Sequence, residues 1–248
     1  MYKKLLLLIF ALLLVIPAQG QTDNGLILSA GLSHKINKKL SVGGEVEMRT
    51  RNDFKTMDRW IVSLGADYKI AKYLKASLDY NLMVDKNKEK ISYDDATAEE
   101  LVVNKWTPSY WSARHRFNVS FTGSVDAGHF SLSLRERWQY TYSPESEQDQ
   151  YDFTTETWGK KTISGKGKSV LRSRFQAEYN FSKKSKVTPF VSTELFNSWS
   201  LEKIRFIGGA NWKLAKQHSL SFYYRYQIDR TEGEPNMSQI CAGYNFKF

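Results

Sequence analysis

Residues 130–140 read FSLSLRERWQY, and this stretch shows the pattern that decides the fold. Apolar and polar side chains alternate along it with a period of two, which is the period of a β-strand and not of a helix. Phe130, Leu132 and Leu134 fall on one face, and Arg135 and Arg137 fall on the other. The segment is therefore predicted to be a strand with one apolar side and one charged side.

The same alternation recurs along most of the chain. Each segment spans about 10 residues, roughly twice the average strand of a soluble protein, and a tilted strand that crosses a bilayer needs about that length. Aromatic residues lie near the ends of the apolar face, as Trp60 and Tyr68 do, which fits the aromatic girdles of outer-membrane barrels. Eleven segments show the pattern: 25–36, 40–49, 59–70, 74–82, 114–122, 130–140, 171–179, 187–196, 205–214, 219–229 and 239–248.

Composition excludes several other classes of protein. The chain has 248 residues, of which 41% are hydrophobic, and its mean hydropathy of −0.50 rules out a bundle of membrane helices. Its single cysteine excludes a disulfide framework and a cysteine-rich zinc site. No metal-binding or phosphate-cradling motif occurs, so we expect no cofactor and no metal site. The formal charge of +10 is predicted to point into a barrel, so we expect no nucleic-acid partner.

The amino terminus resembles an export signal. Lys3 and Lys4 precede an apolar run from Leu5 to Ile16, and the small residues Ala18 and Gly20 follow it. We therefore predict a signal peptide at 1–20 and a mature β-barrel domain at 21–248. Removal of the two lysines leaves 34 basic residues against 26 acidic ones. Together with the strands, this predicts a protein in the cell outer membrane of a Gram-negative cell, in contact with membrane lipid and lipopolysaccharide.

Connections between the segments alternate between short and long. Short ones are predicted at 37–39, 71–73, 126–129, 182–185 and 215–217, and longer ones at 52–57, 85–111, 143–168, 197–202 and 230–236. Outer-membrane barrels have short periplasmic turns and longer extracellular loops. The second group is accordingly expected to be extracellular.

The carboxyl end supports the same class. The chain stops at Phe248, and apolar residues precede it at steps of two, with Phe246 and Tyr244 nearest the end. This arrangement is similar to the terminal-strand signal that the outer-membrane insertion machinery reads. We expect that machinery to be a partner.

The number of strands does not fit the usual rule. Bacterial single-chain barrels normally have an even number of strands, whereas eleven segments would make the first and last strands parallel neighbours. Either segment 25–36 is not a full strand, which leaves ten, or one strand is missed, which gives twelve. The predicted fold is therefore an all-β, transmembrane, antiparallel up-and-down β-barrel of about 10–12 strands, and twelve is favoured.

Short arginine-rich motifs carry a resemblance to a known family. They are Arg114-His115-Arg116, Arg135-x-Arg137, Leu171-Arg172-x-Arg174, Pro189 followed by Glu194, and Glu45-x-Glu47-x-Arg49. In these the mature chain resembles the outer-membrane barrels grouped as domain of unknown function 2490. The resemblance implies an outer-membrane barrel and brings no established activity, substrate or catalytic residue.

By alternation, the arginines of these motifs point into the lumen. The strand directions place them toward the extracellular half, where they would form a basic belt accompanied by fewer acids. The predicted belt contains Arg49, Arg51, Arg114, Arg116, Arg135, Arg137, Arg172, Arg174, Arg205 and Arg225, and its predicted acidic partners are Glu45, Glu47, Glu178 and Glu194.

Two interpretations of the belt compete. Arginine–glutamate networks can fill a small barrel and hold its walls together, which would make the lumen structural. A ring of arginines can instead favour anions in a narrow channel, because guanidinium groups stay charged and offer paired donors. Both can hold at once if some arginines lack an acidic partner.

Two further functions stay open at this point. A lipid hydrolase or deacylase would need a serine nucleophile near a histidine base, and His115 has Ser112 and Ser120 nearby in sequence. His115 is predicted to face lipid, where such enzymes act, although an enzyme is the less favoured class. A surface-binding protein could instead act through the two longest extracellular loops.

Overall fold

The computed structural model describes residues 22–94, 102–182 and 185–248, so the predicted signal peptide lies outside the described residues. All the regular elements of the described residues are β-strands, and no helix among these residues is long and apolar enough to cross a membrane. The strands are β1 (Thr22–Lys35), β2 (Leu40–Arg51), β3 (Thr56–Ala71), β4 (Leu74–Asn87), β5 (Lys90–Asp94), β6 (Val102–Thr107), β7 (Tyr110–Ala127), β8 (Phe130–Ser143), β9 (Ser146–Asp152), β10 (Thr157–Ile163), β11 (Lys166–Tyr179), β12 (Val187–Ser198), β13 (Ser200–Lys213), β14 (His218–Asp229) and β15 (Asn236–Lys247).

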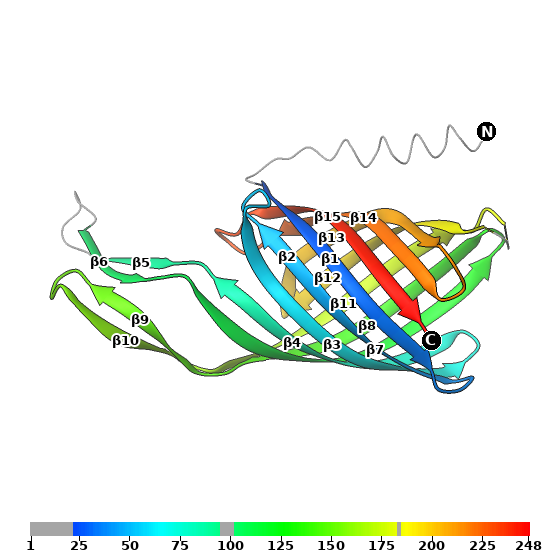
Figure 1. The fold of residues 1–248 in the computed structure, drawn as a ribbon, viewed down its shortest axis with the longest axis horizontal. Coiled ribbons are helices and arrows are strands. Elements are labelled where there is room, and N and C mark those ends of the chain that lie inside the picture. The colour runs from blue at the N-terminus through cyan, green and yellow to red at the C-terminus, as the bar shows by residue number, and fades with distance from the viewer. Residues whose placement is uncertain (1–21, 95–101, 183–184) are drawn as a thin grey trace.

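Eleven of these strands close into a barrel, in the order β1-β15-β14-β13-β12-β11-β8-β7-β4-β3-β2 (Figure 1). Each consecutive pair is antiparallel except the closing pair, in which β1 runs parallel to β15 from Thr22↔Asn236 to Ser33↔Lys247. The preference for twelve strands was therefore wrong, and so was the alternative of ten. Segment 25–36 is a full wall strand, and the parallel seam satisfies the backbone groups of both edges, as a closed sheet in lipid requires.

Polar and apolar residues are distributed in the opposite way to those of a soluble protein. Among the described residues, the buried set holds 14 polar or charged residues and only seven hydrophobic ones. Large apolar side chains such as Leu64, Leu78 and Phe175 are instead exposed on the outer face. Because burial of polar groups is favourable only when they are hydrogen-bonded, the lumen must be a bonded network.

The two ends of the barrel differ. At one end, called the turn end, short connections join β1 to β2 and β3 to β4. At the other, called the hairpin end, β4 continues into the β5–β6 hairpin and β8 continues into β9–β10. Strict alternation of short and long connections was wrong, because Trp199 alone joins β12 to β13 at the hairpin end, whereas residues 180–186 join β11 to β12 at the turn end.

The two longest connections are themselves ordered as strands. β10, β9, β6 and β5 pair in that order into a second sheet that projects from the hairpin end (Figure 1). Its four strands each contribute one apolar residue to a single row, in the order Ile91, Trp106, Tyr151 and Trp158. The Trp106 and Trp158 rings lie 5.9 Å apart, and the Tyr151 and Trp158 rings 5.2 Å apart.

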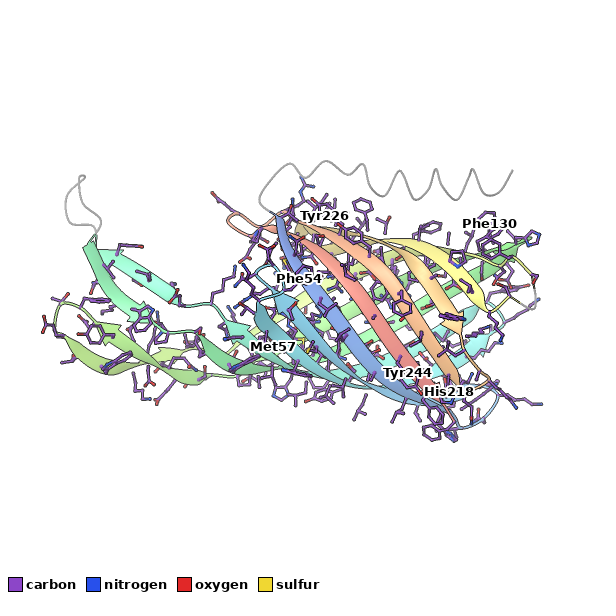
Figure 2. All side chains as sticks on the ribbon, turned by 45° about the horizontal axis from the view of Figure 1, so that its top comes forward. Phe54, Met57, Phe130, His218, Tyr226 and Tyr244 are labelled. Atoms are coloured by element: carbon purple, nitrogen blue, oxygen red, sulfur yellow. The ribbon has the colours of Figure 1, made fainter. Side chains whose placement is uncertain are left out.

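Aromatic residues occur at both ends of the barrel wall. Figure 2 shows Phe130, His218 and Tyr244 at the turn end and Phe54 at the hairpin end. Trp60 and Trp138, which alternation placed outward, are 41% and 48% exposed. This distribution matches the two interfacial bands of a membrane barrel.

Candidate functional site: the lumenal arginine belt

Four arginines face each other across the β8–β11 ladder. The register pairs Arg172 with Arg137 and Arg174 with Arg135, directly opposite one another. These four residues are called the arginine quartet. Like charges placed directly opposite on a sheet are destabilising, so the arrangement requires negative charge close by.

Glu194 on β12 supplies part of that charge. Its side chain is 0% exposed, and Arg172 donates to its two carboxylate oxygens at 2.7 and 2.6 Å. Arg205 Nη1 donates at 3.1 Å and Arg135 Nη2 at 3.3 Å, while Arg174 Nε lies 4.0 Å away. One carboxylate thus serves four guanidinium groups, and such charge-assisted bonds are the stronger kind.

Strand register explains why Glu194 is at the centre. The residue is directly opposite Arg174 on β11 and directly opposite Arg205 on β13. Phe196, two residues further along β12, lies under the guanidinium groups of Arg172 and Arg205, with centroid distances of 4.8 and 4.7 Å. The ring faces attract these cations and hold them beside the carboxylate.

Other acids neutralise individual arginines around the belt. Asp79 accepts from Arg137 at 3.1 Å, and Arg137 also donates to Ser120 at 2.8 Å. Glu47 pairs with Arg49 on the same strand. Near the hairpin end, Arg51 pairs with Asp58 at 3.2 Å. These pairs fix the arginine side chains against the wall.

Asp85 holds two further arginines, although the sequence predicts it in the long connection at 85–111. The structure places it in β4, 7% exposed, where it accepts from Arg59 and, at 2.7 Å, from Arg114. The alternation that would have marked it is interrupted by Met83, an apolar side chain that points inward and is fully buried. Arg59 lies on the polar face of its segment, so alternation alone could have added it to the belt.

Two belt arginines have only neutral partners. Arg116 donates to Thr141 at 3.0 Å, and Arg225 donates to Gln239 at 2.9 and 2.5 Å. No carboxylate of the described residues lies within 4.0 Å of either guanidinium group. The positive charge of these two residues is therefore not neutralised by direct contact.

A cavity of about 440 Å³ opens between these side chains in the lumen. Among the described residues, its walls carry an excess of four formal positive charges, from Arg49, Arg116, Arg137, Arg172, Arg174, Arg205 and Arg225 against Glu45, Glu47 and Glu194. Several buried donors near it lack a hydrogen-bond partner among the described residues, including Nε of Arg172, Arg174 and Arg205 and the Ser192 hydroxyl. Leaving such a group unsatisfied costs about 1–3 kcal/mol.

Two of the four predicted acidic partners do not contact arginine. Glu178 accepts a hydrogen bond from Gln176 at 2.6 Å, and it lies one residue before the end of β11, at the turn end. Glu45 lines the cavity without an ion pair among the described residues. Glu178 was predicted as a partner of the arginines only because it lies on the inner face of its strand. Its position near the end of β11 separates it from the belt arginines.

His115 is not assembled with a serine. Its ring nitrogen shares a hydrogen bond with the Tyr80 hydroxyl at 2.8 Å on the outer face. Ser120 instead accepts from Arg137 in the lumen, and Ser112 accepts from Asn87 at 2.8 Å. The two serines and the histidine therefore lie on opposite sides of β7, and the structure brings together no nucleophile and base at this position.

The closed barrel with a polar lumen and an apolar outer face defines the class: a β-barrel of the outer-membrane type. A solved structure with the same fold is the beta domain of the Bordetella autotransporter Brka, with a TM-score of 0.50 and 10% sequence identity over 78% of this chain and 79% of that one. A weaker likeness is to the CymD monoaromatic hydrocarbon channel, with a TM-score of 0.41 and 7% identity over 80% of this chain and 66% of that one.

The family follows from the sequence itself. A family model described as "Protein of unknown function (DUF2490)" matches residues 24–238, and the chain belongs to this family. The resemblance inferred from the arginine motifs is thereby confirmed. No curated protein matches this sequence.

Proposed function

We propose that the protein is an integral barrel of the outer membrane whose narrow lumen admits small anions in preference to cations. The observation that carries the proposal is the cavity of about 440 Å³, where arginines outnumber glutamates by four. Fixed positive charge lowers the electrostatic energy of an anion inside a low-dielectric wall and raises that of a cation.

The arginines that lack a carboxylate contact support this proposal most directly. Paired guanidinium groups contribute little net field, because the partner charge cancels them at short range. Arg116 and Arg225 line the same cavity and donate only to neutral groups, so their charge acts on a passing ion. Glu194, in contrast, holds the quartet in place.

A filled structural barrel is the second candidate, and the Glu194 network favours it. The fully buried Glu194 carboxylate accepts hydrogen bonds from Arg135, Arg172 and Arg205. These bonds link β12 to β8, β11 and β13. Such a network stiffens the wall whether or not ions pass. The two candidates differ in a single measurable property, the conductance of the purified protein.

The proposed orientation follows from the two ends. We infer that the hairpin end is extracellular, where the projecting sheet can reach lipopolysaccharide, and that the turn end is periplasmic. An exposed aromatic residue beside β15 supports contact of this strand with the insertion machinery. Phe248 is exposed at the turn end, and its ring stacks on that of His34 with the ring centroids 4.7 Å apart. Surface binding through the projecting sheet stays a prediction.

The test is the reversal potential of the purified barrel in a planar bilayer under a salt gradient. We expect anion preference in the native protein and reduced preference in Arg116→Gln. Arg230→Gln is the matched control, since Arg230 is exposed between β14 and β15, and it should leave the preference unchanged. Cation preference would overturn the proposal, and absence of conductance would favour the filled structural barrel.

A further inference from the structure

The arginine quartet has less negative charge around it than its geometry demands. Its four guanidinium groups come in two directly opposed pairs, while Glu194 and Asp79 are the carboxylates within 4.0 Å of them among the described residues. Arg205 adds a fifth positive charge that shares Glu194. Two carboxylates therefore face five arginines, and opposed like charges on a sheet persist only with compensation.

Unsatisfied polar atoms at the same place form a second, independent observation. Ser192 is 6% exposed, lies two residues before Glu194 on β12, lines the cavity, and its hydroxyl has no hydrogen-bond partner among the described residues. The Nε atoms of Arg172 and Arg174 are likewise buried and unpaired, and both residues line the cavity. Buried polar atoms in native proteins are normally hydrogen-bonded, so these donors indicate a missing acceptor.

From charge and donors together, we infer that the cavity beside the quartet binds a phosphate-class oxyanion. This inference rests on the proposed function, because the ligand must reach the lumen. Arg174 is the quartet member held most loosely, with its nearest carboxylate oxygen 4.0 Å away, and it is the principal ligand-binding residue. The Ser192 hydroxyl donates a further hydrogen bond.

The chemistry of the site selects this class over simpler anions. Phosphate presents several acceptor oxygens and more than one negative charge, and guanidinium forks match pairs of such oxygens. Chloride and nitrate carry a single charge, and therefore leave most of the excess positive charge uncompensated. A lumen that merely contained diffuse positive charge would not distinguish among these anions by site.

The experiment measures binding and current on the refolded, purified full barrel in detergent and in bilayers. Isothermal titration calorimetry with inorganic phosphate, glycerol 3-phosphate, chloride and nitrate gives the ligand class, and separates free phosphate from a phosphorylated organic solute. In bilayers, added phosphate should reduce the chloride current, and this reduction should level off at high phosphate concentration. We expect saturable phosphate binding and no saturable binding of chloride or nitrate.

Variants separate a defined site from a general field. Arg174→Gln and Arg174→Lys should both weaken phosphate binding by about tenfold. Both variants lose the guanidinium fork, although lysine keeps the positive charge. Arg225→Gln, which removes the same charge from the same cavity away from the quartet, should change it by less than about threefold. Heat-modifiable gel migration establishes that each variant is folded.

The outcomes distinguish failure of this inference from failure of the proposed function. Equal weakening by Arg174→Gln and Arg225→Gln, or equal saturation by phosphate and nitrate, would show a diffuse field and overturn the oxyanion site while anion preference stands. Cation preference in the bilayer would overturn the proposed function. Saturable phosphate binding in detergent without conductance would support the site and reject the channel.

Discussion

Replacing Glu194 by glutamine is expected to destabilise the barrel by about 3–5 kcal/mol, the typical cost of removing one partner from a buried ion pair. The native carboxylate is 0% exposed and accepts hydrogen bonds from Arg172, Arg205 and Arg135. Glutamine has nearly the same shape, but it is neutral and turns one acceptor oxygen into an NH₂ group that faces guanidinium donors. The arginine quartet would then lose its central counter-charge.

The assay is equilibrium unfolding in phospholipid vesicles, with urea as denaturant and tryptophan fluorescence as the signal. The matched control is Glu178→Gln, an identical chemical change on an inward-facing glutamate of β11 that accepts from Gln176 and contacts no arginine among the described residues. We expect the control to change the free energy of unfolding by less than about 0.5 kcal/mol, as for a substitution outside a buried network.

Glu194→Gln should lower the stability of the barrel and at the same time raise its preference for anions. Loss of one negative charge from the cavity wall raises the excess positive charge, so Glu194→Gln should shift the reversal potential further toward anions. A variant whose unfolding free energy lies within 1 kcal/mol of the native protein, or one no less stable than Glu178→Gln, would refute the reasoning that Glu194 holds the belt together.

Three other predictions test separate parts of the structure. Gly209→Ala should destabilise the barrel by about 1–3 kcal/mol, because a Cβ there would lie 2.3 Å from the Phe222 carbonyl oxygen. Gly123→Ala should be tolerated, because a Cβ at Gly123 meets nothing within 4 Å. Urea unfolding of both variants measures the difference. Asp85→Asn should cost about 3 kcal/mol, since it removes the shared carboxylate of two arginines, and a shift in the thermal transition of heat-modifiable gel migration measures it. Trp106→Ala should separate the two hairpins of the projecting sheet, because β6 and β9 share only two register pairs. Limited proteolysis of that sheet should then be faster, while conductance stays unchanged. Unchanged protease resistance would contradict the role of the aromatic row.

The distribution of side chains between the two faces was predictable from the sequence because it is a local property. In a strand, successive side chains point to opposite sides, so the alternation at 130–140 fixes which residues meet lipid and which meet the lumen. The eleven wall segments, the apolar outer face and the inward direction of Arg135 and Arg137 all follow from it. Glu136 interrupts this pattern on the outer face, where its carboxylate accepts a hydrogen bond from the Ser173 hydroxyl at 2.7 Å.

Which charges meet inside the barrel could not be predicted in the same way. That depends on the register of neighbouring strands and on the stagger of a closed sheet, both of which join residues far apart in the chain. Alternation places both Glu178 and Glu194 on the inner face and does not distinguish them. The register of the strands places only Glu194 opposite Arg174 and Arg205. The direction of a side chain is set by its own strand, whereas its partner is set by another.

From the sequence alone came the strand character, the barrel class, the family resemblance and an arginine-rich interior. Tertiary structure alone decided the parallel seam between β1 and β15, the continuation of two connections as a paired sheet, and the place of Asp85 in the wall. The physical reason is that periodicity is encoded residue by residue, while closure and register are fixed only when every strand finds both of its neighbours.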